Sequence, residues 1–567
     1  MNKFKYHIFE KIVDEVGSDD IDDSILEVPP DPELGDYAFP CFVLSKKLKK
    51  SPQAIAEFLA TKIKPDEFIQ EVKPTGPYLN FFINKSKFAE STIRTILEKK
   101  VDYGRGSGSR TVMIESPGPN TNKPLHLGHV RNMLLGNGVG SILRFNGNKV
   151  INVNINNDRG VHICKSMLAY MLWGKNEEPD MKSDHFVGKW YVKYAQELKN
   201  NPDLDNQIRD VLKKWEAGDK ETLTLWKKMN TWAFNGFKQT YAKFDMVHDK
   251  EYYESEHYNS GKQFALDGLK SGALQKDEDG NIIADMEEKN LGKKVILRAD
   301  GTSVYITQDM ALANIRFNDF PDADQLVYVV GSEQNHQFKQ IFEVFRILGF
   351  PFANKCYHLS YGMVNLPDGK MKSREGTVVD ADDIVDEVQS LAKAAIELRH
   401  KDLNDEEILN RASVIGMAAL RFFILKQDPG KDMTYDPKAS ISFEGETGPY
   451  VQYVHARVQA IKKKYNKPID TDIDFSLLKT PEELLLIKLL EAWPATAHEA
   501  ADKLKPSTIA HYLINLCQHF NEFYHRRRVI DDEREELTKA RILLCECTRQ
   551  VVEIGLDVLG IQSPDEM

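Results

Sequence analysis

The chain has 567 residues, more than one hydrophobic core usually supports, so about three domains of roughly 150 residues are expected. Its 41% hydrophobic and 28% charged residues are typical of a soluble globular protein. No apolar run approaches the roughly 20 residues of a membrane helix, so no membrane span is expected. A net charge of -11 excludes indiscriminate nucleic-acid binding but allows a local basic surface.

Residues 1–108 are expected to form a small α+β module. It begins with an amphipathic helix that lacks the uninterrupted apolar segment of a secretory signal. A helix pair is predicted between residues 34 and 63, and residues 76–84 (GPYLNFFIN) read as a strand. The glycines and serines of residues 101–110 predict a flexible linker to the next domain.

The six cysteines are scattered along the chain, and no CxxC pair occurs among them. Cys545 and Cys547 would point to different faces of a helix, which suits neither a tetrahedral metal site nor a disulfide framework. We therefore expect reduced structural thiols in a cytoplasmic protein, with no tightly bound metal or prosthetic group.

Residues 109–435 are predicted to be an α/β domain built on a Rossmann-like parallel sheet. Residues 111–115, a helix to about residue 145 and residues 149–155 form a βαβ pattern, which requires parallel strands. Three further strands are expected at residues 295–299, 304–306 and 326–330. A helical, aromatic-rich insertion is predicted at about 164–292, and residues 436–567 are predicted to be an all-α bundle.

A loop that opens the first helix of this domain carries Lys123, His126, Gly128 and His129. Helix N-termini favour anions, imidazoles can donate hydrogen bonds to phosphate oxygens, and a glycine lets a flat base approach the backbone. The two histidines could equally be surface residues. No carboxylate or cysteine stands at metal-ligand spacing, which argues against zinc.

A second basic loop contains Lys370, Met371 and Lys372 in the run KMKSR. Alone, such a loop is more typical of a solvated surface. Together and in this order on an α/β pattern, HLGH and KMKSR resemble the paired "HIGH" and "KMSKS" signatures of class I aminoacyl-tRNA synthetases. The family's second loop lysine falls at Ser373 here. Lys123 matches a lysine that arginyl enzymes carry and that takes over the missing charge.

The resemblance extends to the arginyl branch over the whole chain, through ESPGPNTNKPLHLGH (115–129), GPYLN (76–80) and GPYVQYVHAR (448–457). It implies an arginine–tRNA ligase with ATP and Mg²⁺, L-arginine and tRNA(Arg) as partners, acting as a cytoplasmic monomer. It also implies that residues 1–108 bind the tRNA D-loop and residues 436–567 the anticodon. NDRG at 157–160 departs from the family's commoner NDWG.

A pocket selective for arginine needs carboxylates, because a guanidinium is planar, forked and permanently charged. The resemblance places Asp309 and Glu254 on the guanidinium with Tyr305 beside them, and Glu115, Asn120 and Gln334 on the α-ammonium and carboxylate end. The spacing of Tyr305 and Asp309 is expected to place them on one side of an extended segment. The alternative for Asp309 is a helix N-cap.

Contacts with RNA are expected on both flanking modules. RNA recognition favours unstacked bases laid on aromatic side chains. Tyr450 and Tyr453 are candidates for the anticodon, and Tyr78 and Asn80 for the D-loop. For each of these residues, ordinary packing is an equally good interpretation.

Two other functions are consistent with parts of the sequence. Another HxGH nucleotidyltransferase would use the same first loop, but such chains are shorter and lack the flanking modules. A synthetase-like RNA-binding protein without catalysis would keep the architecture. The presence of Lys123, His126, His129, Asp309 and Lys370 favours the ligase.

Overall fold

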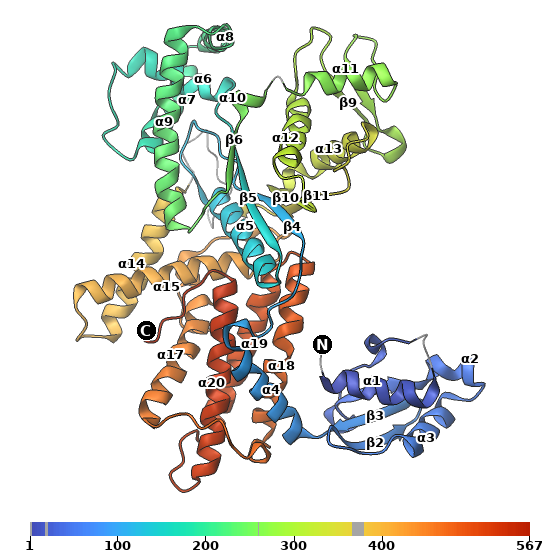
Figure 1. The fold of residues 1–567 in the computed structure, drawn as a ribbon. Coiled ribbons are helices and arrows are strands. Elements are labelled where there is room, and N and C mark those ends of the chain that lie inside the picture. The colour runs from blue at the N-terminus through green and yellow to red at the C-terminus, as the bar shows by residue number, and fades with distance from the viewer. Residues whose placement is uncertain (1–2, 18–20, 259, 366–378) are drawn as a thin grey trace.

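The computed structural model describes residues 3–17, 21–258, 260–365 and 379–567. The α/β sheet lies at the centre, the N-terminal module to one side and the helical bundle below it (Figure 1). The predicted fold class is confirmed: a parallel sheet with a helical insertion, an α+β N-terminal module and an all-α C-terminal region.

The N-terminal module is a three-stranded antiparallel sheet in the order β1-β3-β2, packed against helices. The predicted strand at residues 76–84 is β3. The predicted helix pair is wrong in its first half, because residues 37–40 form a strand with all four side chains buried. An apolar run ending in proline is better suited to a sheet edge than to a helix interior. The elements are α1 (Lys3–Val16), β1 (Tyr37–Pro40), α2 (Ser45–Leu48), α3 (Pro52–Lys62), β2 (Ile69–Thr75) and β3 (Tyr78–Ile83).

The stretch predicted to be a flexible linker is packed against the rest of the protein. After α4 (Lys85–Lys99), Tyr103 is buried, and its hydroxyl donates to the carbonyl of Leu490 at 3.0 Å. The indole of Trp493 donates to the carbonyl of Tyr103 at 2.9 Å. Gly104 has φ +84° and lies so close to Trp493 that a Cβ would stand 2.6 Å from the indole nitrogen. The glycines here serve close approach rather than mobility.

The central sheet has five parallel strands in the order β11-β10-β4-β5-β6. The chain runs from β4 outward to β6, then returns to build β10 and β11 on the other side of β4. This reversal between β4 and β10 is where open α/β sheets bind ligands. The strands are β4 (Thr111–Glu115), β5 (Lys149–Asn156), β6 (Lys250–Tyr253), β10 (Gln325–Gly331) and β11 (Cys356–Tyr361), with α5 (Leu127–Phe145) joining β4 to β5.

A helical insertion separates β5 from β6 and has its own aromatic core. Trp190 and Trp232 are buried in it, and the ring of Phe186 meets both edge to face, at 5.9 and 5.3 Å between centroids. β6, which lies within the range expected for the insertion, belongs to the central sheet. The insertion helices are α6 (Val161–Trp173), α7 (Ser183–Leu198), α8 (Leu204–Glu216) and α9 (Lys220–Lys243).

Between β6 and β11, apart from β10, the described residues form a small antiparallel sheet of three strands and four α-helices. The strand predicted at 295–299 is present as β9, but it joins this separate sheet. The strand predicted at 304–306 is wrong: α12 begins at Tyr305. Thr307 Oγ1 accepts from the amide of Val304 and donates to the carbonyl of Ile296, which fixes the helix start. The elements are α10 (Glu254–His257), α11 (Lys262–Ser271), β7 (Gln275–Lys276), β8 (Ile282–Asp285), β9 (Lys293–Leu297), α12 (Tyr305–Asp319) and α13 (Asn335–Ile347).

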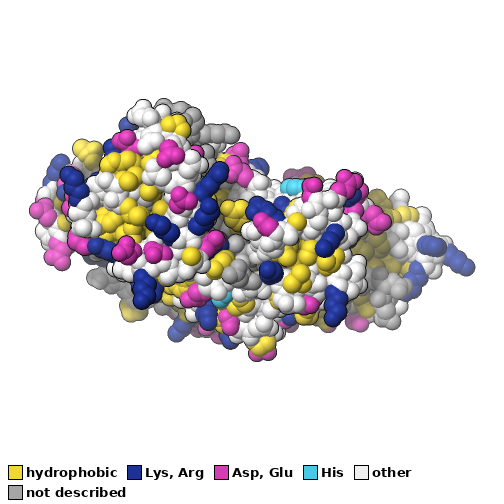
Figure 2. Space-filling model, turned by 90° about the horizontal axis from the view of Figure 1, so that it is seen from above, with side chains coloured by type: hydrophobic (Ala, Val, Ile, Leu, Met, Phe, Trp, Pro, Cys, Tyr) yellow, Lys and Arg dark blue, Asp and Glu magenta, His cyan; other side chains and the backbone are white. Residues whose placement is uncertain are grey.

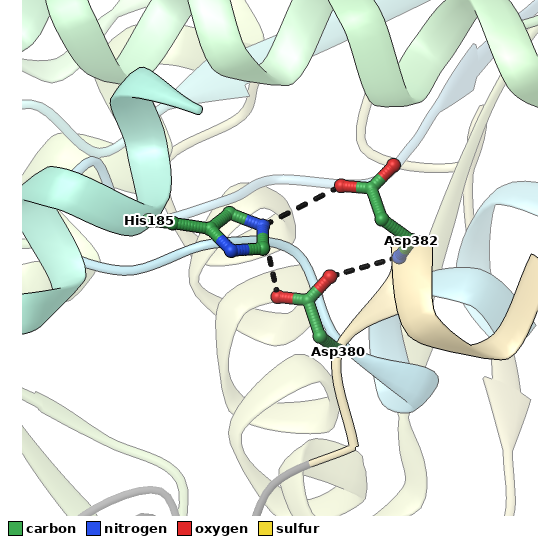
Figure 3. A group of neighbouring side chains, drawn as sticks. All are labelled: His185, Asp380 and Asp382. Atoms are coloured by element: carbon green, nitrogen blue, oxygen red, sulfur yellow. Dashed lines mark hydrogen bonds and ion pairs between the residues drawn. The ribbon is translucent and has the colours of Figure 1, made fainter. Parts of the chain in front are cut away.

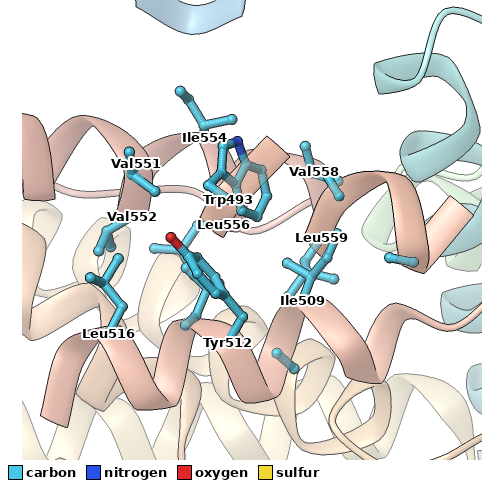
Figure 4. Close-up of a cluster of buried hydrophobic side chains, with 14 of the residues drawn as sticks. Trp493, Ile509, Tyr512, Leu516, Val551, Val552, Ile554, Leu556, Val558 and Leu559 are labelled. Carbon is cyan, nitrogen blue, oxygen red and sulfur yellow. The ribbon is translucent and has the colours of Figure 1, made fainter. Parts of the chain in front are cut away.

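The described residues after β11 are mainly helical, apart from the short strand pair β12 and β13. Trp493 and Tyr512 lie at the centre of the bundle core, among aliphatic side chains of α19 and α20 (Figure 4). The elements are β12 (Val364–Asn365), α14 (Ala381–Arg399), α15 (Asp405–Leu425), β13 (Met433–Thr434), α16 (Pro437–Ser440), α17 (Gly448–Tyr465), α18 (Pro481–Asp502), α19 (Pro506–Arg526) and α20 (Glu535–Val558).

Among the described residues, one helix, α15, is long and apolar enough by composition to cross a membrane. Most of that apolar window, 61%, is buried inside the molecule, as in the core helix of a globular domain. On the face seen from above, basic and acidic side chains are interspersed rather than segregated (Figure 2).

Gly104→Ala is expected to destabilise the protein more than a glycine substitution at an open position. The added methyl group meets the Trp493 indole, which costs about 1–3 kcal/mol beyond the backbone strain. Gly218→Ala is the matched control, because Gly218 also has positive φ (+77°) but nothing lies within 4 Å of the point where its methyl group would stand. Urea unfolding followed by tryptophan fluorescence measures both; equal losses would contradict the packing argument.

Candidate active site

A cavity of about 550 Å³ opens at the carboxyl ends of β4 and β10, the point where the sheet order reverses. Glu115 ends β4, and in the register of the sheet it lies beside Tyr328 of β10. The cavity is therefore where the topology predicts a ligand. The predicted site residues that line it are Glu115, His126, Gly128, His129, Glu254, Asp309 and Gln334.

The two histidines of the HLGH loop are held by backbone amides at the start of α5. His126 is the N-cap residue, and its Nδ1 accepts from the amide of Gly128 at 3.1 Å. Nδ1 of His129 accepts from the amide of His126, also at 3.1 Å. An imidazole nitrogen that accepts carries no proton, so each neutral ring carries its proton on Nε2. Both rings thus keep one hydrogen-bond donor for a ligand.

Burial keeps both imidazoles uncharged at neutral pH. It lowers the pKa of His126 to about 3, with a further contribution from Lys123, and lowers that of His129 well below its usual value. Nζ of Lys123 lies 3.5 Å from Nε2 of His126. Burial also lowers the pKa of Lys123. Two groups that can both donate converge on one point, an arrangement that suits an anionic oxygen.

Acidic side chains form the other side of the cavity. Asp309 lies on α12, and its Oδ2 atom is buried without a hydrogen-bond partner among the described residues. Burial raises the pKa of Asp309 to about 7; Glu115 and Glu254 add to the shift, and Arg316 opposes it. Burial likewise raises the pKa of Glu254 to about 7 against the opposing effect of Arg159. Such a cluster favours a cation.

Three of the described residues predicted for the amino-acid and ATP sites do not line this cavity: Tyr305, Asn120 and Lys123, the last of which lies beside His126. Tyr305, in the first turn of α12, is 75% exposed, and Asn120 follows β4 and forms a backbone bridge with Asn157. The expectation that Tyr305 and Asp309 share an extended segment is wrong, because both lie in a helix, one turn apart. The N-cap alternative for Asp309 is also wrong: the N-cap residue is Val304.

Sequence reasoning missed Arg316, which lines the cavity and forms an ion pair with Glu115. Arg316 follows Asp309 by seven residues, two turns of α12, so both point from one face of the helix. A lone arginine on the otherwise apolar and buried face of the predicted helix was the signal that could have identified it.

The departure from NDWG at residues 157–160 is explained by aromatic packing. The guanidinium of Arg159 lies 3.9 Å from the ring centroid of Tyr258 and 5.2 Å from that of Trp215. It also pairs with Glu216 at 2.8 Å. Arg159 therefore joins α8 of the insertion to the segment after β6 that carries Glu254.

The second basic loop, with Lys370, Met371 and Lys372, lies outside the described residues. The chain that follows it runs beside the HLGH loop. The amide of Leu127 donates to the carbonyl of Val379 at 3.1 Å, and the amide of Ala381 donates to the carbonyl of Leu125 at 3.0 Å. Residues 379–381 are thus tied to the start of α5.

His185, Asp380 and Asp382 approach one another at the spacing of metal ligands (Figure 3). Asp382 is already paired with Lys182 at 2.7 Å and with Lys243 at 2.9 Å. The carboxylates of Asp380 and Asp382 raise the pKa of His185 to about 10, so its imidazole is protonated at neutral pH. A protonated imidazole does not bind a metal. The cluster is an ion-pair network that joins α7 and α9 of the insertion to the start of α14.

An exposed aromatic group lies on the C-terminal bundle. The guanidinium of Arg457 stands 4.6 Å from the ring centroid of Tyr453 and 5.1 Å from that of Tyr524. Tyr453 is 39% exposed, whereas Tyr450 is half-buried and its hydroxyl accepts from Asn521 at 2.9 Å. Arg457 and Tyr524 were not predicted, although the spacing of Tyr453 and Arg457 places them one helical turn apart.

The two RNA candidates of the N-terminal module differ in exposure. Asn80 is buried, and its amide donates to Oγ1 of Thr75 at 3.2 Å. Tyr78 is partly exposed and meets the half-exposed ring of Phe42 edge to face, at 6.2 Å. Of these two residues, only Tyr78 therefore has a side chain that is accessible from the surface.

Comparison with known families agrees with this geometry. The family model "tRNA synthetases class I (R), catalytic domain" matches residues 92–436, more than half of the chain. "Arginyl tRNA synthetase N terminal domain" matches residues 3–83, and "DALR anticodon binding domain" matches residues 451–567. The sheet, its switch-point cavity and the HLGH helix are those of a class I aminoacyl-tRNA synthetase.

Similar proteins show which family within this class the chain belongs to. Arginine–tRNA ligases of Treponema denticola and Bacteroides fragilis are 43% and 40% identical, over 94% and 93% of this chain and 93% and 92% of theirs. The solved arginyl-tRNA synthetase of Thermus thermophilus superposes with a TM-score of 0.82 at 26% identity, covering 99% of this chain and 100% of that one. The chain belongs to the arginyl-tRNA synthetase family.

The ion-pair network around His185 predicts a specific dependence of stability on pH. The folded pKa of about 10 lies above the unfolded value of roughly 6.5, so the stabilisation is complete below the unfolded value and is lost as pH rises toward 10. His185→Ala is expected to lower the unfolding temperature most near pH 6, with the difference from wild type shrinking at alkaline pH. His498→Ala, at an exposed ion pair, is the control. A difference that is constant with pH would contradict the assignment.

Proposed function

We propose that this chain is an arginine–tRNA ligase that activates L-arginine with ATP and transfers it to the 3′ end of tRNA(Arg). The observation that carries the proposal is the buried Oδ2 atom of Asp309, which has no hydrogen-bond partner among the described residues and shares the cavity with Glu115 and Glu254. A buried carboxylate of this kind is stabilised by a cation that can donate hydrogen bonds. The family relationship supports the guanidinium of arginine as that cation.

The acidic side of the cavity is proposed to hold the amino acid. Asp309 and Glu254 take the guanidinium, and Tyr305 covers it from the exposed rim. Glu115, Asn120 and Gln334 take the α-ammonium and α-carboxylate end. Lysine carries the same charge but lacks the planar fork, so it leaves hydrogen bonds of the buried carboxylates unmade. That loss provides discrimination without a separate editing site.

The basic side of the cavity is proposed to hold ATP. The Nε2–H groups of His126 and His129 and the ammonium of Lys123 donate to phosphate oxygens, and Gly128 gives the adenine ring access to the backbone. Lys370, Met371 and Lys372 are proposed to complete this site, with Lys123 supplying charge in place of the lysine that is absent at Ser373. ATP enters as its Mg²⁺ complex, which is substrate rather than a resident cofactor.

The reaction then follows from position and charge. A carboxylate oxygen of arginine attacks the α-phosphorus, the bond to the bridging oxygen breaks, and pyrophosphate leaves with the negative charge. A hydroxyl of the terminal adenosine of tRNA next attacks the carbonyl carbon of arginyl-adenylate, releasing AMP. Neutral imidazoles and ammonium groups stabilise the charge that develops on phosphate oxygens, so no side chain needs to form a covalent bond.

The flanking modules are proposed to bind tRNA. Tyr453, Arg457 and Tyr524 offer a stacking surface for an anticodon base, with Tyr450 held behind them. Tyr78 is proposed to face the D-loop, with Asn80 supporting the strand from inside. The proposed boundaries are residues 1–108 for the D-loop module, 109–435 for catalysis with an insertion at about 164–292, and 436–567 for the anticodon module.

The setting is proposed to be a cytoplasmic monomer with no membrane partner. The six cysteines carry free thiols, five of them buried, which suits a reducing compartment. Light scattering of the purified chain, alone and with tRNA, tests the monomer.

Pyrophosphate exchange into ATP tests the function. Exchange is expected with arginine and not with lysine, glutamate or cysteine, and it is expected to require tRNA. Exchange with a different amino acid would favour another activating enzyme. No exchange with any amino acid, despite tRNA binding, would favour an RNA-binding protein without catalysis.

Asp309→Asn is expected to raise the KM for arginine roughly a hundredfold while the KM for ATP stays close to wild type, because a charge-assisted pair to a buried carboxylate is lost. Exchange kinetics with each substrate varied in turn measure both constants. Asp322→Asn, at an exposed aspartate just beyond α12, is the control. Equal losses for arginine and ATP would mean that Asp309 does not contact the amino acid.

The KM for arginine is expected to fall as pH rises from about 6 to 8. Asp309 and Glu254, both with a pKa of about 7, bind a guanidinium only when ionised. Arginine keeps its guanidinium charge over this range, so the change belongs to the pocket. In Asp309→Asn the dependence is expected to weaken; an unchanged profile would exclude Asp309 as its source.

Tyr453→Ala is expected to weaken tRNA(Arg) binding by about 1–3 kcal/mol, the contribution of one stacked base. The exchange rate at saturating tRNA is expected to stay near wild type, because the side chain lies on the bundle rather than in the cavity. Filter binding measures the affinity. Tyr357→Ala, at a similarly exposed tyrosine on β11, is the control, and an equal effect there would remove the case for stacking.

A further inference from the structure

The cavity proposed to bind arginine contains a guanidinium of the chain itself. Arg316 on α12 is fully buried, and its Nη1 pairs with Oε2 of Glu115. Glu115 is the carboxylate proposed to meet the α-ammonium group. The proposed mechanism gives Arg316 no role.

Aromatic rings from two other strands fix the position of Arg316. Its guanidinium lies 5.3 Å from the ring centroid of Tyr252 on β6 and 5.8 Å from that of Tyr328 on β10. The hydroxyl of Tyr252 donates to Asp319 at 2.9 Å, which holds that ring in turn. A guanidinium bounded by two rings and one carboxylate has little freedom to turn. Because the two rings hold Arg316 in place, the ion pair fixes the orientation of the Glu115 carboxylate, and Glu115 is not what fixes Arg316.

The charged side chains that line the cavity indicate what the arrangement does. Glu115, Glu254, Asp309 and the exposed Glu333 line it together with Arg316. Asp309 and Glu254 are left for the guanidinium of arginine, and Glu115, paired with Arg316 through Oε2, keeps Oε1 for the α-ammonium group. This step rests on the proposed function.

We propose that Arg316 is a positioning residue for the amino acid: it holds Oε2 of Glu115 so that Oε1 faces the α-ammonium group, and it offsets the charge of one carboxylate of the pocket. Arg316 itself contacts neither arginine nor ATP. It acts through Glu115 and through the ionisation of Asp309.

Loss of Arg316 is expected to make arginine binding more sensitive to pH. Arg316 lowers the pKa of Asp309, and Glu115 and Glu254 raise it. Without Arg316, the pKa of Asp309 rises further, and Asp309 takes up a proton at neutral pH. Alkaline conditions remove that proton and restore the charge. The titratable groups that face Arg316 are Glu115 of β4, Tyr252 of β6, Tyr328 of β10, Cys356 of β11 and Asp309 of α12 itself.

The experiment compares Arg316→Met, which removes the charge at similar length, with Arg316→Lys, which keeps the charge and removes the fork. Arg541→Lys is the matched control, because Arg541 is also buried and pairs with buried Glu483 at 2.7 Å, but in the C-terminal bundle. Arginine-dependent pyrophosphate exchange is measured at saturating tRNA between about pH 6.5 and 8.5, and yields the KM for arginine, the KM for ATP and kcat.

Arg316→Met is expected to raise the KM for arginine about tenfold or more near pH 7, with part of the loss recovered at the alkaline end. Its KM for ATP is expected to stay near wild type. Arg316→Lys is expected to raise the KM for arginine less and with the pH dependence of wild type. Arg541→Lys is expected to behave as wild type.

Three results would overturn the inference: an unchanged KM for arginine in both variants, equal increases for arginine and ATP, or a loss in Arg316→Met that is the same at every pH. If Arg316→Met does not fold, Arg316→Lys decides, because a selective rise in the KM for arginine supports the inference and its absence overturns it. Wild-type protein without arginine-dependent exchange contradicts the proposed function instead, so the two failures are distinguishable.

Discussion

The rest of the site depends on three partly buried carboxylates that share one cavity. Glu115, Glu254 and Asp309 come from β4, α10 and α12. Burial raises the pKa of Asp309 and of Glu254, and the neighbouring Glu115 and Glu254 raise that of Asp309 further. One guanidinium, that of Arg316, is built in beside them. On the proposed function, a dicationic amino acid supplies the positive charge that the other carboxylates lack. Glu115 is held at the end of a strand of the parallel sheet, whereas Glu254 and Asp309 are brought beside it by α10 and α12.

The opposite side of the cavity carries neutral imidazoles instead of carboxylates. Backbone amides at the start of α5 set the tautomers of His126 and His129, and burial keeps both rings neutral. Neutral donors are suited to a polyanion and add no positive charge next to Lys123. On the proposed function, the carboxylates on one side of the cavity select a cation, and the imidazole and ammonium donors on the other side receive phosphate.

Ion pairs and hydrogen bonds link the helical insertion and the start of α14 to the residues around the cavity. Lys182 and His185 from the insertion pair with Asp382, and residues 379–381 hydrogen-bond to the HLGH loop. Arg159 joins the insertion to the segment of Glu254 through its stacking on Tyr258. The insertion is therefore connected to both sides of the cavity.

The sequence alone determined the strand, loop and helix around Thr111–Glu115 and Leu127–Phe145, the three-part organisation and the family, because hydrophobic periodicity and short motifs are local. It also indicated Glu115, Glu254 and Asp309 through the family resemblance, but it assigned an extended segment to what is the first turn of α12. Only the tertiary structure brought Arg316 against Glu115, turned Tyr305 outward and buried Asn80. It also packed the glycine-rich stretch after α4 against Trp493. Those features depend on which surfaces meet across the sheet and between domains, and pairings between residues some 200 to 390 positions apart leave no periodic trace in the chain.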